Sequence, residues 1–443
     1  MLRTPVRLLA SAFCAVLLLS AALSAAERKV IVISIDGLKG TTLASLASRG
    51  WKTPNLLEFT TGGAVSAGLV GVYPTVTYPS HTAIVTGRSP SAHGIHGNTL
   101  FDPERVMNGA WYWYSEQIAV PTLWDLARAK GLKTAGVYWP VTVGAALDYN
   151  IPEFRSPRTI EDRMLVRAVS TPGLFAEFEA RHGAVPITRY PDRIRAQMAA
   201  FLIESRKPDL LFIHLTDYDH EEHAFGPDAP ETLPTIEAID AALGIIRGAV
   251  RKAGLEAATT FVITSDHGFR PVQKSLHPNA ILNSLGLTAP AGKPAAWRVA
   301  VHANGGSFAL IARDANDSQA VELATRAFKL LESEGMWGIE RVLDRAALTA
   351  ARGYPGAFLS VTMASGFTAG SALDGAWLTG SGNTRGTHGY LPGSPEMDAS
   401  FAAFGPGIKP AKLPRGKLVD VAPTVAALLG LSVPNAEGVN LLP

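Results

Sequence analysis

With 443 residues, the chain is long enough for one large domain with an insertion or for two domains. Its 40 basic and 38 acidic side chains give a formal net charge of +2 and form no basic tract, so we expect a small or amphipathic substrate and no nucleic-acid polymer as partner. The only cysteine, Cys14, lies in an N-terminal apolar run, which excludes disulfides and cysteine-bound metals from the rest of the chain.

Residues 1–26 have the pattern of a secretory signal peptide. Arg3 and Arg7 precede an apolar run at 8–23, and three small residues follow it. The run is shorter than the ~20 residues of a membrane span, and no later segment reaches that length. We therefore expect a periplasmic or secreted protein without stable membrane insertion. A retained N-terminal anchor is the alternative.

Three short runs, at 29–37, 209–217 and 259–268, are apolar almost throughout and rich in Val, Ile and Leu. This composition is typical of strands that are buried on both faces of a parallel sheet. Helix-like stretches at 120–131 and 235–254 lie between them. The alternation predicts an α/β fold with a doubly wound, mostly parallel central sheet and helices on both faces.

The pattern changes from about 278 to 380. Residues 298–314 are typical of a hairpin and residues 317–335 of a helix, and glycine and alanine are frequent. We expect a smaller α+β insertion here, within a catalytic domain that spans 27–443. The chain is expected to rejoin the main sheet over 386–410 and to close with a helix at 418–431.

Side chains that can bind metal follow each of the three strand-like runs. They are Asp36 after the first, Asp217 and Asp219 after the second, and Asp266 and His267 after the third. In open α/β sheets the active crevice lies outside the carboxyl ends of the strands. A single Asp at such a place is usually a turn former or a helix cap, but three carboxylates aimed at one place need a positive partner. A metal ion is the simplest candidate.

The spacing of these residues supports a metal site. Asp219 and His223 are four residues apart, so one helical turn brings both to the same face. Asp266 and His267 converge only if the strand ends at the glycine that follows them. His388, between two glycines, adds a distant nitrogen. Asp and His without Cys suit zinc in catalytic sites, and also manganese or iron.

Thr77 is the candidate nucleophile. Pro79 and Ser80 are residues that start helices, so Thr77 is expected just before a helix N-terminus, where negative charge is favoured. A threonine hydroxyl attacks only after a metal or a base removes its proton. With Thr77 there are seven candidate ligands, too many for one tetrahedral ion but suited to two ions roughly 4 Å apart. A plain cap or turn residue is the alternative.

The motifs VISIDG, YPTVTYPSHTAIVTGRSPSAHGIHGN, DYDHEEHAFGP, TSDHGF and GTHGYLP occur in this order along the chain. Together they resemble the nucleotide pyrophosphatase/phosphodiesterase family of the alkaline phosphatase superfamily. The resemblance implies an alkaline-phosphatase-like fold and two Zn²⁺ ions per chain. It implies one ion bound by Asp36, Thr77, Asp266 and His267, and the other bound by Asp219, His223 and His388.

The resemblance also implies that Asn98 donates a hydrogen bond to a phosphoryl oxygen, a role that spacing alone would not single out. Tyr78, next to the nucleophile, is the candidate for contact with the substrate, and the aromatic stretch at 111–114 and residues 138–139 could stack on a nucleobase. Four nearby residues do not fall on the ligand positions of the family's motifs and are rival ligands only if the second segment has another register. These are His214, His220, Asp217 and Glu222.

The implied reaction is hydrolysis of a phosphodiester or pyrophosphate bond through a phosphoryl-threonine on Thr77. Nucleotide-type diesters are the favoured substrates. The segment WPVTV at 139–143 departs from the WPG of nucleotide-cleaving relatives, which leaves a lipid-type diester open. A phosphomonoesterase or an enzyme acting on phosphonates is a further alternative, and so is a protein that only binds metal or phosphate.

Overall fold

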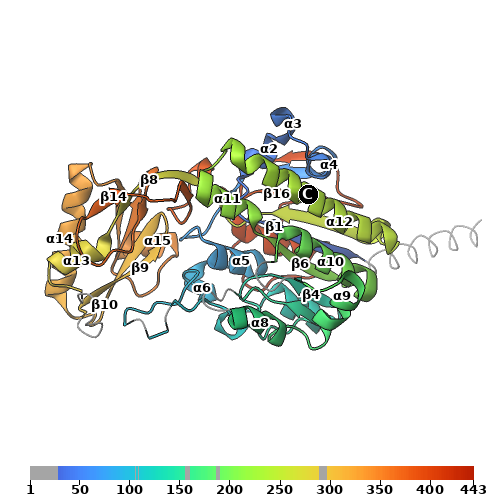
Figure 1. Ribbon diagram of the computed structural model, residues 1–443, viewed down its shortest axis with the longest axis horizontal. Coiled ribbons are helices and arrows are strands. Elements are labelled where there is room, and N and C mark those ends of the chain that lie inside the picture. The colour runs from blue at the N-terminus through green and yellow to red at the C-terminus, as the bar shows by residue number, and fades with distance from the viewer. Residues whose placement is uncertain (1–27, 105, 108, 155–159, 186–189, 289–296) are drawn as a thin grey trace, which may run out of the picture.

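The computed structural model describes residues 28–443 except 105, 108, 155–159, 186–189 and 289–296 (Figure 1). The leader expected at 1–26 lies outside these residues. The largest element is an eight-stranded sheet with the order β17-β2-β16-β7-β1-β6-β4-β5. Its strands are, in that order, Ala411–Leu413, Ala64–Ser66, Phe401–Phe404, Thr259–Thr264, Lys29–Ile35, Leu210–Leu215, Thr134–Val137 and Tyr149–Ile151.

The three expected strands are the neighbouring strands β7, β1 and β6 at the centre of this sheet. β1 pairs in parallel with both others, with Ile33 opposite Ile213 on one side and Ile263 on the other. β4 pairs in parallel with β6 and with β5. Only β16 runs antiparallel, between β7 and β2. The prediction of a mostly parallel central sheet is therefore confirmed.

Successive side chains of β1 enter two different cores, which explains why most of the strand is apolar. Ile31, Ile33 and Ile35 join one buried cluster, whereas Val30 and Val32 join another. The first core is covered by α4 (Pro54–Gly62), α9 (Leu174–His182), α10 (Asp192–Arg206) and α12 (Leu233–Lys252). The second is covered by α5 (Thr77–Thr86), α7 (Leu123–Ala129) and α16 (Val421–Leu428). Helices thus cover both faces, as in a doubly wound fold.

The remaining helices of the main body are short. They are α2 (Gly40–Ala44), α3 (Leu46–Arg49), α6 (Pro90–His93), α8 (Ile160–Ala168) and α11 (Asp217–Phe225). A two-stranded sheet pairs β3 (Leu69–Val70) with β18 (Gly416–Lys417). Within the ranges that the structure describes, no helix is long and apolar enough to cross a bilayer.

A second lobe, formed by residues 270–387, lies beside the main sheet (Figure 1, left). Its antiparallel sheet has the order β11-β12-β10-β9, and a smaller sheet has the order β13-β8-β14, with β15 also paired to β8. The strands β8 to β15 are Arg270–Leu276, Val299–Asn304, Ser307–Ala312, Ile339–Asp344, Leu359–Met363, Gly366–Ala369, Leu378–Gly380 and Gly386–Thr387. The helices are α13 (Pro278–Ser284), α14 (Ser318–Glu334) and α15 (Arg345–Ala351).

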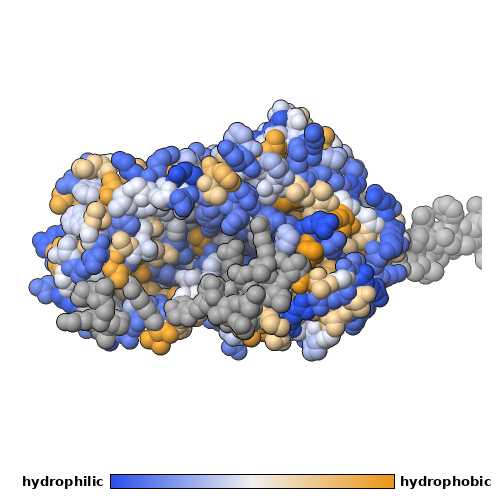
Figure 2. Space-filling view, viewed as in Figure 1, coloured by the Kyte–Doolittle hydropathy of each residue, from blue (hydrophilic) through white to orange (hydrophobic). Residues whose placement is uncertain are grey.

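This lobe has its own buried cluster, which includes Phe308, Leu310 and Phe328. The expected hairpin is the antiparallel pair β9 and β10, and the expected helix is α14. β8 precedes residue 278 but pairs with strands of the lobe. The division of 27–443 into one catalytic domain with an insertion at 278–380 stays a prediction. Hydrophobic residues are scattered over the visible surface of both parts (Figure 2).

Candidate active site

The metal-binding side chains foreseen from the sequence lie at the carboxyl ends of the central strands. Asp36 follows β1 directly, α11 begins two residues after β6, and Asp266 lies two residues after the end of β7. A cavity of about 170 Å³ opens at this edge. Its lining consists of Asp36, Thr77, Asn98, Trp111, Glu153, Asp219, His220, His223 and His388.

One group of potential ligands consists of Asp219, His223 and His388. Asp219 Oδ1 lies 3.5 Å from His223 Nε2 and 3.6 Å from His388 Nε2. His223 Nδ1 donates to the carbonyl of Gly386 at 2.9 Å, and His388 Nδ1 donates to that of Thr75 at 3.1 Å. Because a carbonyl can only accept a hydrogen bond, Nδ1 carries the proton in both rings. The Nε2 atom of each ring, which lies on the side of the carboxylate, can then bind a metal ion through its lone pair.

A second group joins Asp36 and Asp266 to His267. His267 Nε2 lies 3.4 Å from Asp36 Oδ1 and 3.1 Å from Asp266 Oδ2. Its Nδ1 donates to the carbonyl of Gly268 at 3.2 Å. Asp266 and His267 converge because β7 ends at Thr264, as their adjacency requires.

The donor atoms of both groups fit metal ions. Four of them are buried without a hydrogen-bond partner in the structure, namely Asp36 Oδ1, Asp219 Oδ1, Asp266 Oδ2 and His267 Nε2. A buried polar atom of this kind costs about 1–3 kcal/mol unless something compensates it. Aspartate oxygens together with Nε2 atoms form the O/N set that catalytic zinc prefers.

The electrostatics of the protein without metal agree with a site built for cations. Burial, together with the charges of Asp219 and Asp266, raises the pKa of Asp36 well above its usual range. Burial alone would also raise the pKa of Asp266, but the charge of His267, whose Nε2 lies 3.1 Å from Asp266 Oδ2, outweighs it and holds that pKa well below its usual range. Burial lowers the pKa of His267, yet Asp266 outweighs it and raises the pKa to about 9.

Thr77 is the first residue of α5 rather than the residue before it, and its side chain is 7% exposed. The N-cap position of this helix is Val76, so Thr77 does not occupy the place that the plain-cap alternative requires. Asn98 Oδ1 accepts a hydrogen bond from the backbone N–H of Tyr78 at 2.9 Å. The amide group of Asn98 therefore faces Thr77, with Nδ2 3.5 Å from Thr77 Oγ1.

The rings of Tyr78 and Trp139 are both fully buried. Tyr78 packs with Ile95 and Val141, and its ring lies 5.1 Å from that of Trp111. This corrects the expectation that Tyr78 offers its ring to the substrate. Of the aromatic residues considered, Trp111 is the one in the cavity lining.

His214 and Glu153 are two residues of the site that sequence reasoning did not assign. His214 is fully buried, with Nε2 3.2 Å from Asp36 Oδ2 and Nδ1 3.1 Å from Glu153 Oε2. Burial lowers the pKa of His214, but the bonds to Asp36 and Glu153 outweigh it and raise the pKa to about 10. The ring therefore connects a potential metal ligand to a second carboxylate. A histidine inside the apolar run of β6 was the one available signal.

The other rival ligands differ in their surroundings. Asp217 Oδ2 accepts from the backbone N–H of Asp192, at the start of α10. Glu222 is buried against Gly37, and burial raises its pKa well above the usual range. His220 is exposed at the cavity.

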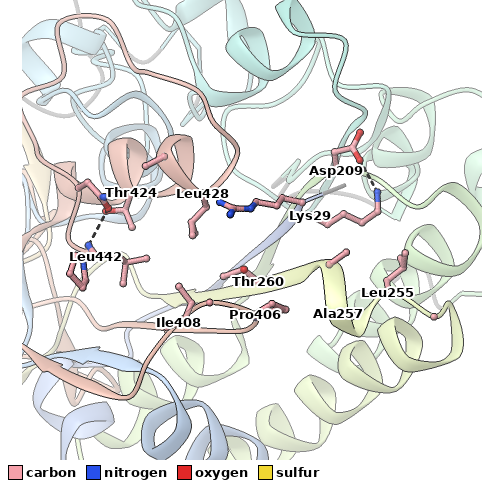
Figure 3. A pocket seen from close by; sticks show the side chains of 17 residues that line it. Lys29, Asp209, Leu255, Ala257, Thr260, Pro406, Ile408, Thr424, Leu428 and Leu442 are labelled. Atoms are coloured by element: carbon pink, nitrogen blue, oxygen red, sulfur yellow. Dashed lines mark hydrogen bonds and ion pairs between the residues drawn. The ribbon is translucent and has the colours of Figure 1, made fainter. Parts of the chain in front are cut away.

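A larger cavity of about 750 Å³ opens at the opposite edge of the sheet (Figure 3). It is lined by Lys29 and Thr260, near the amino ends of β1 and β7, and by Asp209 before β6. Lys29 Nζ pairs with Asp209 Oδ1 at 2.7 Å. None of the potential metal-binding groups in the described residues lies there, so we place the chemistry at the smaller cavity.

Comparison with known proteins identifies the family. Residues 30–391 match the model of type I phosphodiesterase / nucleotide pyrophosphatase. Human ectonucleotide pyrophosphatase/phosphodiesterase family member 1 is 25% identical over 246 residues, which cover 54% of this chain and 23% of that protein. A venom phosphodiesterase of Naja atra is 27% identical over 258 residues, 56% of this chain and 27% of that protein. The matches thus span less than half the length of these relatives.

Solved structures confirm the fold. Human ectonucleotide pyrophosphatase/phosphodiesterase 5 superposes with a TM-score of 0.68 at 19% identity, covering 93% of this chain and 97% of that one. The murine protein, in an inactive threonine-to-alanine variant in complex with AMP, gives a TM-score of 0.67 at 18% identity, with the same coverage. From the family match over most of its length, the chain belongs to the type I phosphodiesterase / nucleotide pyrophosphatase family, within the alkaline phosphatase superfamily.

Proposed function

We propose that the chain hydrolyses phosphodiester or pyrophosphate bonds of small, nucleotide-type substrates through a phosphoryl-threonine on Thr77. The observation that carries the proposal is the convergence of six side chains at one cavity, namely Asp36, Thr77, Asn98, Asp219, His223 and His388, with His267 3.4 Å from Asp36. Family membership and the names of the relatives support the reaction class. The murine neighbour was solved in complex with AMP as an inactive variant in which one threonine is replaced by alanine, and this complex supports a nucleotide substrate.

Each residue has a defined role in this proposal. Asp36, Thr77, Asp266 and His267 hold one Zn²⁺, and Asp219, His223 and His388 hold the other. When bound, the ions lower the pKa of the Thr77 hydroxyl and neutralise charge on the phosphoryl group.

The chain's own groups then carry the reaction. Thr77 Oγ1 attacks phosphorus, the bond to the leaving oxygen breaks, and water hydrolyses the phosphothreonine. Asn98 Nδ2 donates to a non-bridging oxygen.

The lining of the cavity favours a diester over a monoester. A monoester carries more negative charge at phosphorus, yet no Lys or Arg stands among the lining residues that the structure describes. Trp111 offers an aromatic surface on which a base could stack, an interaction worth roughly 1–3 kcal/mol. We therefore expect the purified protein to cleave p-nitrophenyl thymidine monophosphate with a kcat/KM at least ~10-fold above that for p-nitrophenyl phosphate. A preference for the monoester would overturn the diester assignment.

His214 is expected to act on the metal site through Asp36. Replacing it by alanine removes the contact at 3.2 Å and leaves Glu153 without its imidazole partner. Loss of such an outer partner typically weakens metal binding by ~10–100-fold. Zinc titration against a competing chelator should show this shift for His214→Ala. Unchanged affinity would show that Asp36 is held without His214.

We also propose that residues 1–26 direct export and are then removed, giving a periplasmic or secreted protein. The charged residues before the apolar run at 8–23 support this. Edman sequencing of the exported protein should start near Glu27, and a start at Met1 would contradict cleavage.

A further inference from the structure

The turn of the β9–β10 hairpin reaches from the second lobe to two parts of the candidate active site. We propose that this hairpin is a positioning element: His302 holds the loop that carries Asn98, and the turn holds the segment that carries His388. The inference rests on the proposed function, because it needs Asn98 to bind the phosphoryl group. It gives the second lobe a role in catalysis that its distance in sequence from Thr77 does not suggest.

The first contact of the hairpin is with the loop that carries Asn98. His302 Nε2 donates to the carbonyl of Thr99 at 3.1 Å, and the ring is 6% exposed. Burial lowers the pKa of His302, so the ring is neutral and its single N–H lies where the carbonyl accepts it. At Gly97 a Cβ would lie 2.8 Å from Asn304 Oδ1 and 3.0 Å from His302 Nε2. A side chain at Gly97 would therefore have to displace the side chains of Asn304 and His302.

The loop is held on its other side by the main body. Thr99 forms an antiparallel bridge with Trp111, and the N–H of Tyr112 donates to the carbonyl of Asn98 at 3.1 Å. Asn98 thus sits in a backbone segment clamped between residues 111–112 and β9. Because its Nδ2 faces Thr77 Oγ1 at 3.5 Å, a small shift of this segment displaces the donor from the reacting group.

The second contact of the hairpin is with the segment that carries His388. The N–H of Gly306 donates to the carbonyl of His388 at 2.7 Å, and Ser307 Oγ donates to that of Gly389 at 2.6 Å. Gly305 has φ +63°, and a Cβ there would lie 2.4 Å from the carbonyl oxygen of His388. Only glycine suits this position, for its conformation and for its contact.

The hairpin is itself anchored in the lobe. Asn304 Nδ2 donates to the hydroxyl of Tyr354 at 3.0 Å, and Ser307 Oγ lies 3.1 Å from the same hydroxyl. The ring of Tyr354 meets that of Tyr73 edge to face at 5.1 Å between centroids. Because the hairpin is fixed to the second lobe, it holds the Asn98 loop and the His388 segment at fixed positions relative to that lobe.

A double-mutant cycle of His302 and Asn98 tests whether His302 positions the loop that carries Asn98. We expect His302→Ala to lower kcat/KM for p-nitrophenyl thymidine monophosphate about 10-fold, with the zinc content of the holoenzyme unchanged. In the Asn98→Ala background the same change should have no further effect, since His302 acts through Asn98. His302→Gln, whose amide can still donate to Thr99, should recover most of the activity.

The matched control is His277→Ala. His277 is also a buried histidine of the second lobe, and its Nε2 faces Thr379 Oγ1 at 2.9 Å. It lies outside the cavity lining, so kcat/KM should stay at the wild-type value. If His302→Ala does not fold, His302→Phe keeps a ring of similar size without a donor and serves in its place.

The outcomes distinguish failure of the positioning role of His302 from failure of the role assigned to Asn98. Additive losses in the double variant, zinc loss in His302→Ala, or an equal loss in His277→Ala would each overturn the role of His302. If Asn98→Ala alone leaves kcat/KM unchanged, the assigned role of Asn98 fails, and this inference fails with it. Losses in both single variants without additivity support the positioning role.

Discussion

Replacing Thr77 by alanine is expected to reduce turnover of a phosphodiester by ~10⁴-fold or more, the scale on which removal of a nucleophile acts. The variant keeps Asp36, Asp266 and His267, so it should still bind metal at that place. Its fold should also persist, because the N-cap position of α5 is Val76 and not Thr77. Steady-state kinetics and zinc analysis of the same sample measure both parts of this expectation.

Thr82→Ala is the matched control for Thr77→Ala. Thr82 lies in the same helix, is 1% exposed, and donates from Oγ1 to the carbonyl of Tyr78 at 2.8 Å. Thr82→Ala removes this buried hydrogen bond but no group from the cavity lining, so activity should change little. Thr77→Ser keeps a hydroxyl and should keep measurable turnover. If Thr77→Ala turned over at near the wild-type rate, the nucleophile would have to be another group.

The central part of the fold could be predicted because its strands are buried on both sides. β1, β6 and β7 supply residues to both cores, so their sequences are largely apolar on both faces. The edge of the sheet gave no such signal. β2 and β17 have three residues each, and β16 inserts antiparallel between β7 and β2. Pairing of short, distant segments depends on tertiary contacts that no local pattern records.

The proximity of the candidate metal ligands could be predicted, since the chemistry of a metal ion restricts the type and spacing of such residues. The structure brings Asp219, His223 and His388 together, and Asp36 with His267. The residues that surround these candidate ligands are not restricted in type or spacing by the chemistry of the ion. Glu153 meets His214 only because β5 and β6 flank β4, so their ends lie near each other. Likewise, Tyr78 is buried against Trp111, and this contact is not visible in the sequence.

Removing the metal ions is expected to abolish activity and to lower the melting temperature. Without cations, the buried carboxylates of Asp36, Asp219 and Asp266 are left with atoms that have no hydrogen-bond partner. An ion held at a free concentration 1,000 times its Kd stabilises the folded state by about 4 kcal/mol. Differential scanning calorimetry before and after dialysis against a chelator measures the loss. Zn²⁺ should restore both activity and stability, whereas Mg²⁺, which prefers all-oxygen sites, should restore neither.

The same site should bind zinc more weakly as the pH falls. In the protein without metal, Asp266 raises the pKa of His267 to about 9 against the effect of burial. Below that pH the ring carries a proton that the ion must displace, so binding releases protons and the apparent affinity declines toward acid pH. Calorimetric titrations in buffers of different ionisation enthalpy measure the proton release. His267→Asn removes the titrating ring, and it should weaken binding and flatten the pH dependence between pH 7 and about 9. Zinc binding without proton release at pH 7 would show that His267 is not a ligand.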